Sequence, residues 1–252
     1  MELTLTTYLI VCPLVFLAGL IDAIAGGGGL ISLPAYYLAG LPPVLAAGTN
    51  KLSASLGTVA STVRYVRSGW VDWRMGLLAA AGAIPGSWLG TQVLQRIPED
   101  AVRVLMICAI PLVACVVLRR RGDLARNSLI PLRWHGGAAL LVGLTIGFYD
   151  GLVGPGTGTF LILLFTMLLG MEAVMASGTA KLVNLASNLA ALFSLLAAGE
   201  VLAALALPAA ACGIAGNWVG AGLGIRKGAG LIRRVLLAVL ALLLAKMVLD
   251  VL

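Results

Sequence analysis

Long apolar runs separated by short connections are the feature that most constrains what this chain can fold into. The runs are long enough to cross a bilayer as helices, which takes about 20 residues each, and a period-two alternation is nowhere sustained. Charged residues make up 11% of the sequence, against about 25% in soluble domains. The sequence therefore predicts an all-α membrane protein, a polytopic helix bundle, and excludes an ordinary soluble domain.

The chain also contains an internal duplication. Residues 19–51 have the sequence GLIDAIAGGGGLISLPAYYLAGLPPVLAAGTNK, and residues 147–181 have the sequence GFYDGLVGPGTGTFLILLFTMLLGMEAVMASGTAK. Asn50 of the first copy aligns with Ala180 of the second, so the two copies are not chemically equal. The matched positions, each in the first copy and then the second, are Asp22 and Asp150, Gly26 and Gly154, Gly28 and Gly156, Gly48 and Gly178, Thr49 and Thr179, and Lys51 and Lys181.

The duplication predicts two homologous transmembrane repeats. We expect the first repeat at residues 1–118, a basic cytoplasmic linker at 119–135 and the second repeat at 136–252. Each repeat has about five apolar elements, with a helix broken at the glycine-rich segment. The expected elements are 8–25, 30–41, 44–67, 71–95 and 101–118 in the first repeat, and 136–153, 158–169, 172–198, 201–223 and 230–251 in the second.

The short pieces at 30–41 and 158–169 decide the membrane topology. If they cross the bilayer, each repeat has five crossings, the second repeat is inverted, and twelve basic residues lie on one side against three on the other. If they re-enter, each repeat has four crossings, the repeats are parallel, and the count is nine against six. Because cytoplasmic loops are enriched in Lys and Arg, we favour the inverted arrangement with both termini outside. A four-plus-four bundle with re-entrant hairpins is the alternative.

The glycine clusters and the Gly-Thr-x-Lys boxes predict a site for an anion. A glycine break leaves backbone N–H groups free at the start of the next helix, where the helix dipole also favours negative charge. The Thr and Asn side chains offer hydrogen bonds, and the lysines offer positive charge. The expected substrate-binding residues are Gly27, Gly28, Gly29, Thr49, Asn50, Lys51, Gly156, Thr157, Thr179 and Lys181.

The two aspartates, Asp22 and Asp150, lie inside the same apolar segments, where a charge costs about 2.5–3.5 kcal/mol on insertion scales. We expect them to serve as structural charges or to couple transport to an ion. In the alternative interpretation the glycines only permit close packing, and Lys51 and Lys181 neutralise the aspartates as buried pairs.

Further glycines form two packing tracks. Gly82, Gly86 and Gly90 recur at every fourth residue, as do their second-repeat counterparts Gly216, Gly220 and Gly224, with Trp88 and Trp218 beside them. This spacing is typical of close helix packing in membranes. The functional alternative is that the two tryptophans line a pathway.

Other classes of site are not supported. The net charge of +7 comes from basic residues in short connections, which indicates membrane orientation and not nucleic-acid binding. One His and no CxxC spacing give no metal site, and the glycine run matches neither a P-loop nor a dinucleotide fingerprint. We therefore expect no cofactor and no enzyme.

The paired motifs resemble those of the sulfite exporter TauE/SafE family of membrane transporters. The similarity covers the 19–51 stretch, GFYDGLVGPGTGTFLILLF at 147–165 and AKLVNLASNLAAL at 180–192, and with them nearly the whole chain. The resemblance implies secondary transport across the bacterial inner membrane, usually export, of small sulfur-containing anions such as sulfite, sulfoacetate and other sulfonates.

The expected partners are a small anionic substrate and the lipid bilayer, with a proton or ion as an optional coupling partner and a homodimer as an optional assembly. Nucleic acid is not expected. The alternatives are an anion channel, a non-transporting scaffold subunit and, least favoured, an intramembrane enzyme with Asp22 and Asp150 as its catalytic pair.

Overall fold

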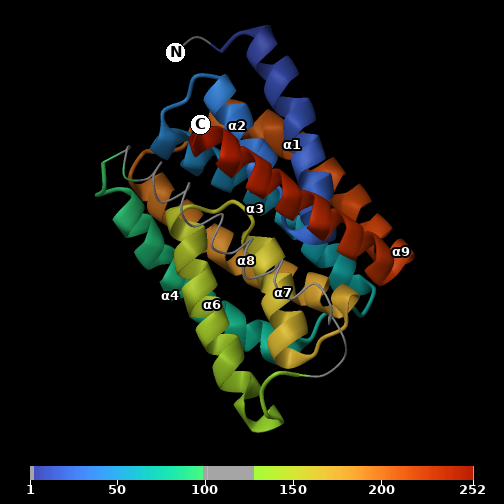
Figure 1. Cartoon of the computed structure of the whole chain (residues 1–252). Coiled ribbons are helices and arrows are strands. Elements are labelled where there is room, and N and C mark those ends of the chain that lie inside the picture. Colours follow the sequence, from blue (N-terminus) through green and yellow to red (C-terminus); the bar gives the residue numbers. More distant parts are fainter. Residues whose placement is uncertain (1–2, 99–100, 102–127, 252) are drawn as a thin grey trace.

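The protein is an all-helical bundle in the part of the chain that the structure describes (Figure 1). The computed structural model describes residues 3–98, 101 and 128–251, with the backbone alone at 233, 236 and 239–251. The helix expected at 101–118 and most of the basic linker lie outside the described residues. The elements are α1 (Leu5–Ala25), α2 (Gly29–Leu38), α3 (Pro43–Arg67), α4 (Trp73–Leu94), the 3-10 turn η1 (Leu132–Trp134), α6 (His135–Leu152), α7 (Thr157–Leu169), α8 (Ala173–Ala197) and α9 (Ala203–Val251), the last kinked at Gly228.

Four described helices are long and apolar enough to cross a bilayer: α1, α4, α8 and the 203–232 part of α9. The short apolar helices α2 and α7 have 10 and 13 residues, which at about 1.5 Å per residue is less than a bilayer core. The expected breaks at the glycine-rich segments are therefore present, one between α1 and α2 and one between α6 and α7.

The first packing track lies between α4 and α6. A Cβ on Gly82 would overlap the carbonyl oxygen of Leu140, and a Cβ on Gly86 would overlap that of Leu144. The contact therefore needs glycine, because the helix backbones approach too closely for any side chain. Residue numbers increase in the same direction along both helices at this contact, so α4 and α6 are parallel.

The second track joins α1 and α9 in the same way. Gly216 packs on the carbonyl of Phe16 and Gly220 on that of Leu20, so these helices also run in parallel. In both tracks a helix of one repeat packs on a helix of the other repeat. The two repeats are therefore interlocked and do not form separate bundles.

The remaining contacts give the direction of α3 and α8. Lys51 near the start of α3 bonds to Asn188 near the end of α8, whereas Tyr65 near the end of α3 lies against Gly178 near the start of α8. The two helices are therefore antiparallel. Along α3, a Cβ on Gly48 would overlap the carbonyl of Glu200, so the start of α3 lies beside the start of α9.

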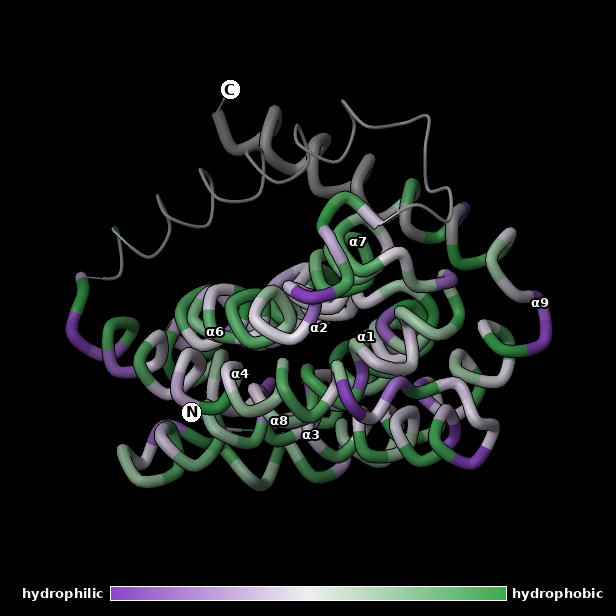
Figure 2. The backbone as a smooth tube through the Cα atoms, turned by 90° about the horizontal axis from the view of Figure 1, so that it is seen from below, coloured by the Kyte–Doolittle hydropathy of each residue, from purple (hydrophilic) through white to green (hydrophobic). Residues whose placement is uncertain are grey.

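The helices thus form two directional groups. One group is α1, α3 and the part of α9 before the kink at Gly228, and the other is α4, α6 and α8, so each of these helices runs opposite to its counterpart in the other repeat. Figure 2 shows the hairpins α1–α2 and α6–α7 in one layer and α3, α4 and α8 in a second. Whether α2 and α7 cross the bilayer, and which side faces the cytoplasm, stay predictions.

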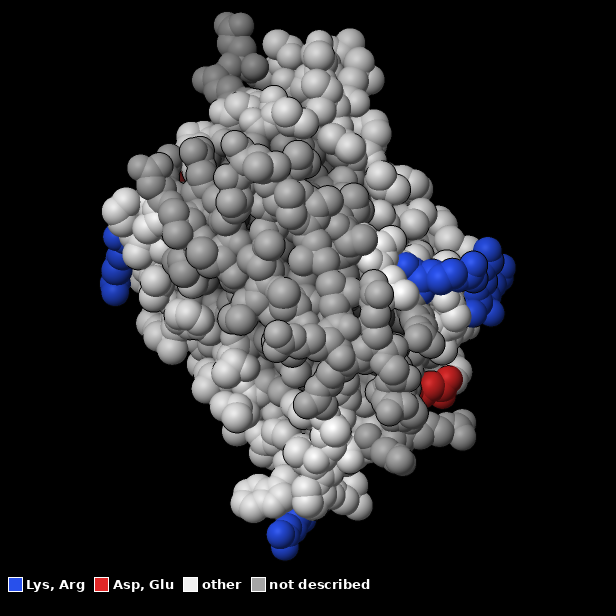
Figure 3. Space-filling model, in the orientation of Figure 1, with Lys and Arg blue, Asp and Glu red and all other residues white. Residues whose placement is uncertain are grey.

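Basic residues gather where several helix ends meet. Arg64 and Arg67 end α3, Arg74 opens α4, and Arg133 precedes α6, and the helix directions bring these ends to one side of the bundle. Arg96 follows α4 at the opposite end. In Figure 3 the visible Lys and Arg side chains lie toward the margins of the molecule. This distribution fits helices that lie across a bilayer.

Candidate functional site

The two glycine breaks meet each other in the interior. Gly26 has a φ of 76° and ends α1, and Gly156 has a φ of 83° and precedes α7, so both turns use the left-handed region that favours glycine. The Gly26 carbonyl accepts the N–H of Thr159 at 3.3 Å, and the Thr159 hydroxyl donates to the Ala25 carbonyl at 2.7 Å. The tips of the two hairpins are thus joined by hydrogen bonds between the repeats.

Two ion pairs lie next to this junction, and both connect one repeat with the other. Lys51 Nζ is 2.7 Å from Asp150 Oδ2, and Lys181 Nζ is 2.6 Å from Asp22 Oδ2. Buried lysine and aspartate side chains need such partners, since removing one partner leaves a charge in an apolar interior. The pairing predicted by the alternative interpretation is therefore present, and each pair is made across the duplication.

The two pairs differ in what surrounds them. Asp150 also accepts hydrogen bonds from Thr157 at 2.8 Å and Ser187 at 2.7 Å, and Lys51 also donates to Asn188 at 2.8 Å. Asp22 accepts the Gly28 N–H at 3.4 Å in addition to its lysine. The acidic group of the first hairpin therefore occupies part of the helix start that the sequence assigned to an external anion.

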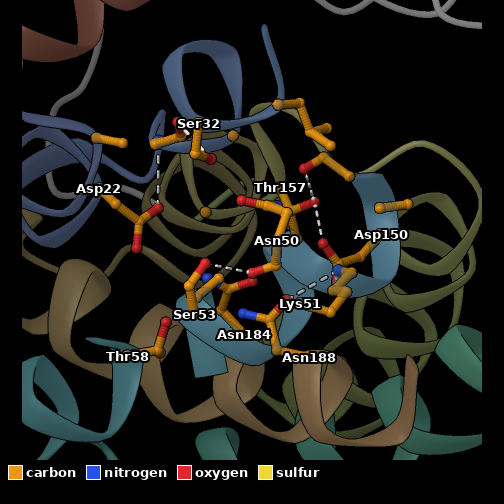
Figure 4. Close-up of a pocket in the computed structure, with 18 of the residues that line it drawn as sticks. Asp22, Ser32, Asn50, Lys51, Ser53, Thr58, Asp150, Thr157, Asn184 and Asn188 are labelled. Atoms are coloured by element: carbon orange, nitrogen blue, oxygen red, sulfur yellow. Dashed lines mark hydrogen bonds and ion pairs between the residues drawn. The ribbon is translucent and has the colours of Figure 1, made fainter. Parts of the chain in front are cut away.

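A cavity with polar and apolar walls lies between α1, α2, α3, α8 and α9 and the ends of α4, α6 and α7 (Figure 4). Asp22 lies at one side of the view, Lys51 and Asp150 lie at the other, and Asn50, Ser53 and Asn184 lie between them. Apolar side chains complete the wall. These are Val15, Leu33, Leu94, Leu152, Val153 and Leu195.

Seven of the twelve expected site residues line this cavity. They are Asp22, Gly28, Gly29, Asn50, Lys51, Asp150 and Thr157. Among the described lining residues the other five, Gly27, Thr49, Gly156, Thr179 and Lys181, are not found. Seven residues predicted from the sequence therefore share the wall of one cavity and five do not, and their role in substrate binding stays a prediction.

Thr49 and Thr179 have a structural contact that explains their conservation of position within the duplication. The Thr49 hydroxyl accepts the N–H of Leu202, just before α9, and the Thr179 hydroxyl accepts the N–H of Asp72, just before α4, each at 3.0 Å. Each hydroxyl thus holds the start of a helix from the other repeat. In the Gly-Thr-x-Lys box, the glycine and threonine fix the neighbouring repeat, and the lysine pairs with its aspartate.

Three asparagines that sequence reasoning missed also line the cavity: Asn184, Asn188 and Asn217. Asn184 and Asn188 follow Lys181 at helical spacing, which places the three side chains near one face of α8 and could have identified them. Asn217 lies between α1 and α3, because a Cβ on Gly19 or Gly57 would come within 2.7 Å of its Nδ2. In the sequence Asn217 lies within the glycine track at residues 216–224, which we interpreted mainly as a packing feature.

Trp88 and Trp218 lie outside the cavity wall. They are 51% and 42% exposed on the outer surface of the bundle. The guanidinium carbon of Arg64 lies 4.9 Å from the centre of the Trp218 ring. The described part of the chain thus supports a surface position for both tryptophans.

Comparison with known proteins identifies the class of protein that this fold and site define. The chain is 35% identical over 237 residues to a probable membrane transporter protein of Haemophilus influenzae, covering 93% of this chain and 92% of the relative. It is 36% identical over 242 residues to the probable membrane transporter protein ORF9 of a Sinorhizobium species, covering 93% and 90%. It is 34% identical over 244 residues to the probable membrane transporter protein YfcA of Escherichia coli, covering 93% and 87%.

These relatives place the chain among the membrane transporters. The family model for the sulfite exporter TauE/SafE matches residues 11–247. The chain therefore belongs to the TauE/SafE family, as the paired motifs predicted. No solved structure matches it.

Proposed function

We propose that this protein is a secondary transporter of the bacterial inner membrane that exports small sulfur-containing anions of the sulfite, sulfonate and sulfoacetate class. The observation that carries the proposal is the cavity between the apolar helices, whose wall includes Lys51, four asparagines and two aspartates, next to the junction of the two hairpins. Substrate sites of transporters with broken, repeated helices lie in such places. The three compared relatives are bacterial membrane transporters, and the matched family bears the name of sulfite export.

Lys51 and Asn188 are the main anion-binding groups in this proposal. Among the described residues Lys51 donates to Asp150 and to the Oδ1 atom of Asn188, which leaves one of its three ammonium hydrogens for a ligand. Because the Asn188 oxygen is occupied by Lys51, its amide N–H groups point elsewhere and can donate to a ligand. Sulfite and sulfonate oxygens are acceptors that suit such a set of donors.

The remaining predicted residues on the cavity wall complete the binding site. Gly28 and Gly29 bring the start of α2 to the cavity, and Asn50 and Thr157 place polar groups on opposite helices. The buried pairs hold two lysines and two aspartates, so the charges balance before a ligand binds. A bound monoanion adds one negative charge, and a coupled proton or cation at Asp22 or Asp150 would offset it.

Transport by purified protein in liposomes tests this function. Sulfite and ethanesulfonate should move across the bilayer at a rate that saturates with concentration, and unlabelled anion on the far side should stimulate exchange. Lys51→Met protein, checked for folding, should lose this activity, with protein-free liposomes as the background. A rate that rises linearly without exchange would assign a channel, and no anion movement under any gradient would support a scaffold subunit.

The membrane orientation has its own test. Single cysteines at residues 119–133 and 226–234 should react with an impermeant reagent from the cytoplasmic side, and cysteines next to Arg96 should react from outside. This outcome follows from the basic residues that end α3 and open α4 and α6. If the cysteines next to Arg96 react from the cytoplasmic side instead, the protein lies in the membrane in the opposite orientation.

A further inference from the structure

The two ion pairs present opposite charges to the same cavity. In the Lys51–Asp150 pair the lysine side chain is 8% exposed and the aspartate 3%, whereas in the Lys181–Asp22 pair the lysine is 0% exposed and the aspartate 15%. Lys181 is absent from the described cavity wall, but Asp22 forms part of it. One end of the cavity therefore presents a lysine together with its less exposed carboxylate, and the other end presents a carboxylate whose lysine is not part of the described wall.

Hydrogen bonding strengthens this contrast. Asp150 accepts three side-chain donors, from Lys51, Thr157 and Ser187. Asp22 accepts Lys181 and the distant N–H of Gly28, and a carboxylate has sites for about four donors. Acceptor capacity thus remains at the Asp22 end of the cavity.

A second, independent feature lies near this end. Asn217 is 4% exposed, and its Oδ1 atom is buried without a hydrogen-bond partner in the part of the chain that the structure describes. Its Nδ2 donates to the Gly213 carbonyl at 3.0 Å, which fixes the orientation of the amide. Gly19 of α1, three residues before Asp22, packs directly against the same amide.

A buried acceptor without a donor costs about 1–3 kcal/mol, and an ordered water, an ion or a ligand can supply the missing donor. Asn50 has the same property: its Oδ1 is also buried without a partner among the described residues, and it lies between the two ends of the cavity. Two unpaired acceptors and an under-coordinated carboxylate do not suit a ligand made only of anionic oxygens. They suit a ligand that also donates hydrogen bonds.

We propose that the ligand of this cavity is dipolar, with a sulfonate or similar anionic group at the Lys51 end and a hydrogen-bond-donating cationic group, such as an ammonium, at the Asp22 end. The inference rests on the proposed function and narrows its substrate class. A zwitterion brings no net charge into the bundle, so the two balanced ion pairs stay balanced when it binds. A dianion such as sulfoacetate would place a second carboxylate opposite Asp22 and is the least favoured member of the class.

Four compounds of similar length test the inference on purified protein by calorimetry: 2-aminoethanesulfonate, 2-hydroxyethanesulfonate, ethanesulfonate and sulfoacetate. Their distal groups are an ammonium, a hydroxyl, a methyl and a carboxylate. Affinity should fall in that order, with 2-aminoethanesulfonate binding at least about tenfold more tightly than ethanesulfonate, as expected of one charge-assisted hydrogen bond. Equal affinities for these two, or tightest binding of sulfoacetate, would overturn the inference while leaving sulfonate transport in place.

Variants test whether the Asp22 end of the cavity causes the preference for 2-aminoethanesulfonate over ethanesulfonate. Asn217→Ala should reduce the ratio of the affinity for 2-aminoethanesulfonate to that for ethanesulfonate about threefold or more. The charge-balanced double variant Asp22→Asn with Lys181→Met should bring the ratio near one. Thr49→Val, outside the cavity wall, is the matched control and should keep the parent ratio. If a double variant does not fold, Asn217→Ala and the compound series decide.

Two further outcomes are decisive. If no sulfonate binds the parent protein, the proposed substrate class fails and the inference fails with it. If sodium raises the affinity for ethanesulfonate to that of 2-aminoethanesulfonate, the Asp22 end belongs to a coupling cation and the inference is wrong.

Discussion

The Lys51–Asp150 and Lys181–Asp22 pairs come from the same duplicated residues but lie in different surroundings. Lys51 lines the cavity, whereas Lys181 is fully buried, and its sequence neighbours Ala180 and Leu182 pack in the largest hydrophobic cluster. The frame around the pairs is nearly the same on both sides, with matched threonine contacts and matched glycine tracks. The repeat therefore builds a symmetric frame, and the residues that differ between copies decide which half opens to ligand.

Three of the residues that differ between the copies are asparagines. Asn50 faces Ala180 in the alignment, and Asn184 and Asn188 match Ala54 and Thr58 at the same offset. In the folded protein all three asparagines line the cavity that Lys51 faces, and Asn188 is bonded to Lys51. Variants can therefore distinguish residues that stabilise the fold in both halves from residues on the Lys51 side that bind the ligand.

The largest expected effect concerns the fully buried lysine. Lys181→Met leaves the Asp22 carboxylate without its ion-pair partner and should destabilise the protein by about 3–5 kcal/mol, enough to reduce the yield of folded particles. Lys51→Met should be milder, because Asp150 keeps its hydrogen bonds from Thr157 and Ser187. Thermal unfolding in detergent measures both.

Adding Asp22→Asn to Lys181→Met is the control for that effect, since the second change removes the unpaired charge. The double variant should recover a large part of the lost stability. A greater loss in Lys51→Met than in Lys181→Met would contradict the contrast between the two halves.

The packing tracks should show the symmetry of the frame. Gly86→Ala and Gly220→Ala each force a Cβ into a neighbouring carbonyl and should cost about 1–3 kcal/mol of stability apiece. Gly137→Ala is the matched control, because a Cβ there meets nothing within 4 Å of the described atoms. Strongly unequal losses at Gly86 and Gly220, measured by thermal unfolding, would show that the tracks are not equivalent.

The smallest expected effect is at the two threonines. Thr49→Val and Thr179→Val each remove one hydrogen bond to a helix start and should cost about 1 kcal/mol, with no change in the affinity for ethanesulfonate. Calorimetry and thermal unfolding on the same samples check both parts. An affinity loss in Thr49→Val would return this residue to the binding site that the sequence first suggested.

Much of the fold could be predicted from the sequence. The membrane class, the duplication and both helix breaks follow from apolar runs and glycine clusters, and the helix bounds agree within a few residues, as at α3 (Pro43–Arg67) against the expected 44–67. The family was also predicted, because the paired motifs cover nearly the whole chain. These features are local in the sequence, or they repeat within it.

The arrangement of the site was harder to predict because it depends on contacts between the repeats. Nothing local in the Gly-Thr-x-Lys box indicates that Thr49 bonds to Leu202, or that Lys51 pairs with Asp150 and not with Asp22. Asn217 was missed for the same reason, since its position is set by Gly19 and Gly57 on two other helices. Interlocking of the repeats cannot be inferred from the order of motifs along one chain.

The central claim is that the anion binds at the Lys51 half of the junction and not at the Lys181 half. Two charge-balanced double variants test it most directly: Lys51→Met with Asp150→Asn, and Lys181→Met with Asp22→Asn. Each is purified, checked for folding and titrated with ethanesulfonate, which has an anionic group but no donor for the Asp22 end. The account predicts at least about a tenfold loss of affinity in the first variant and nearly parental affinity in the second. Parental affinity in the first variant, with the loss confined to the second, would contradict it.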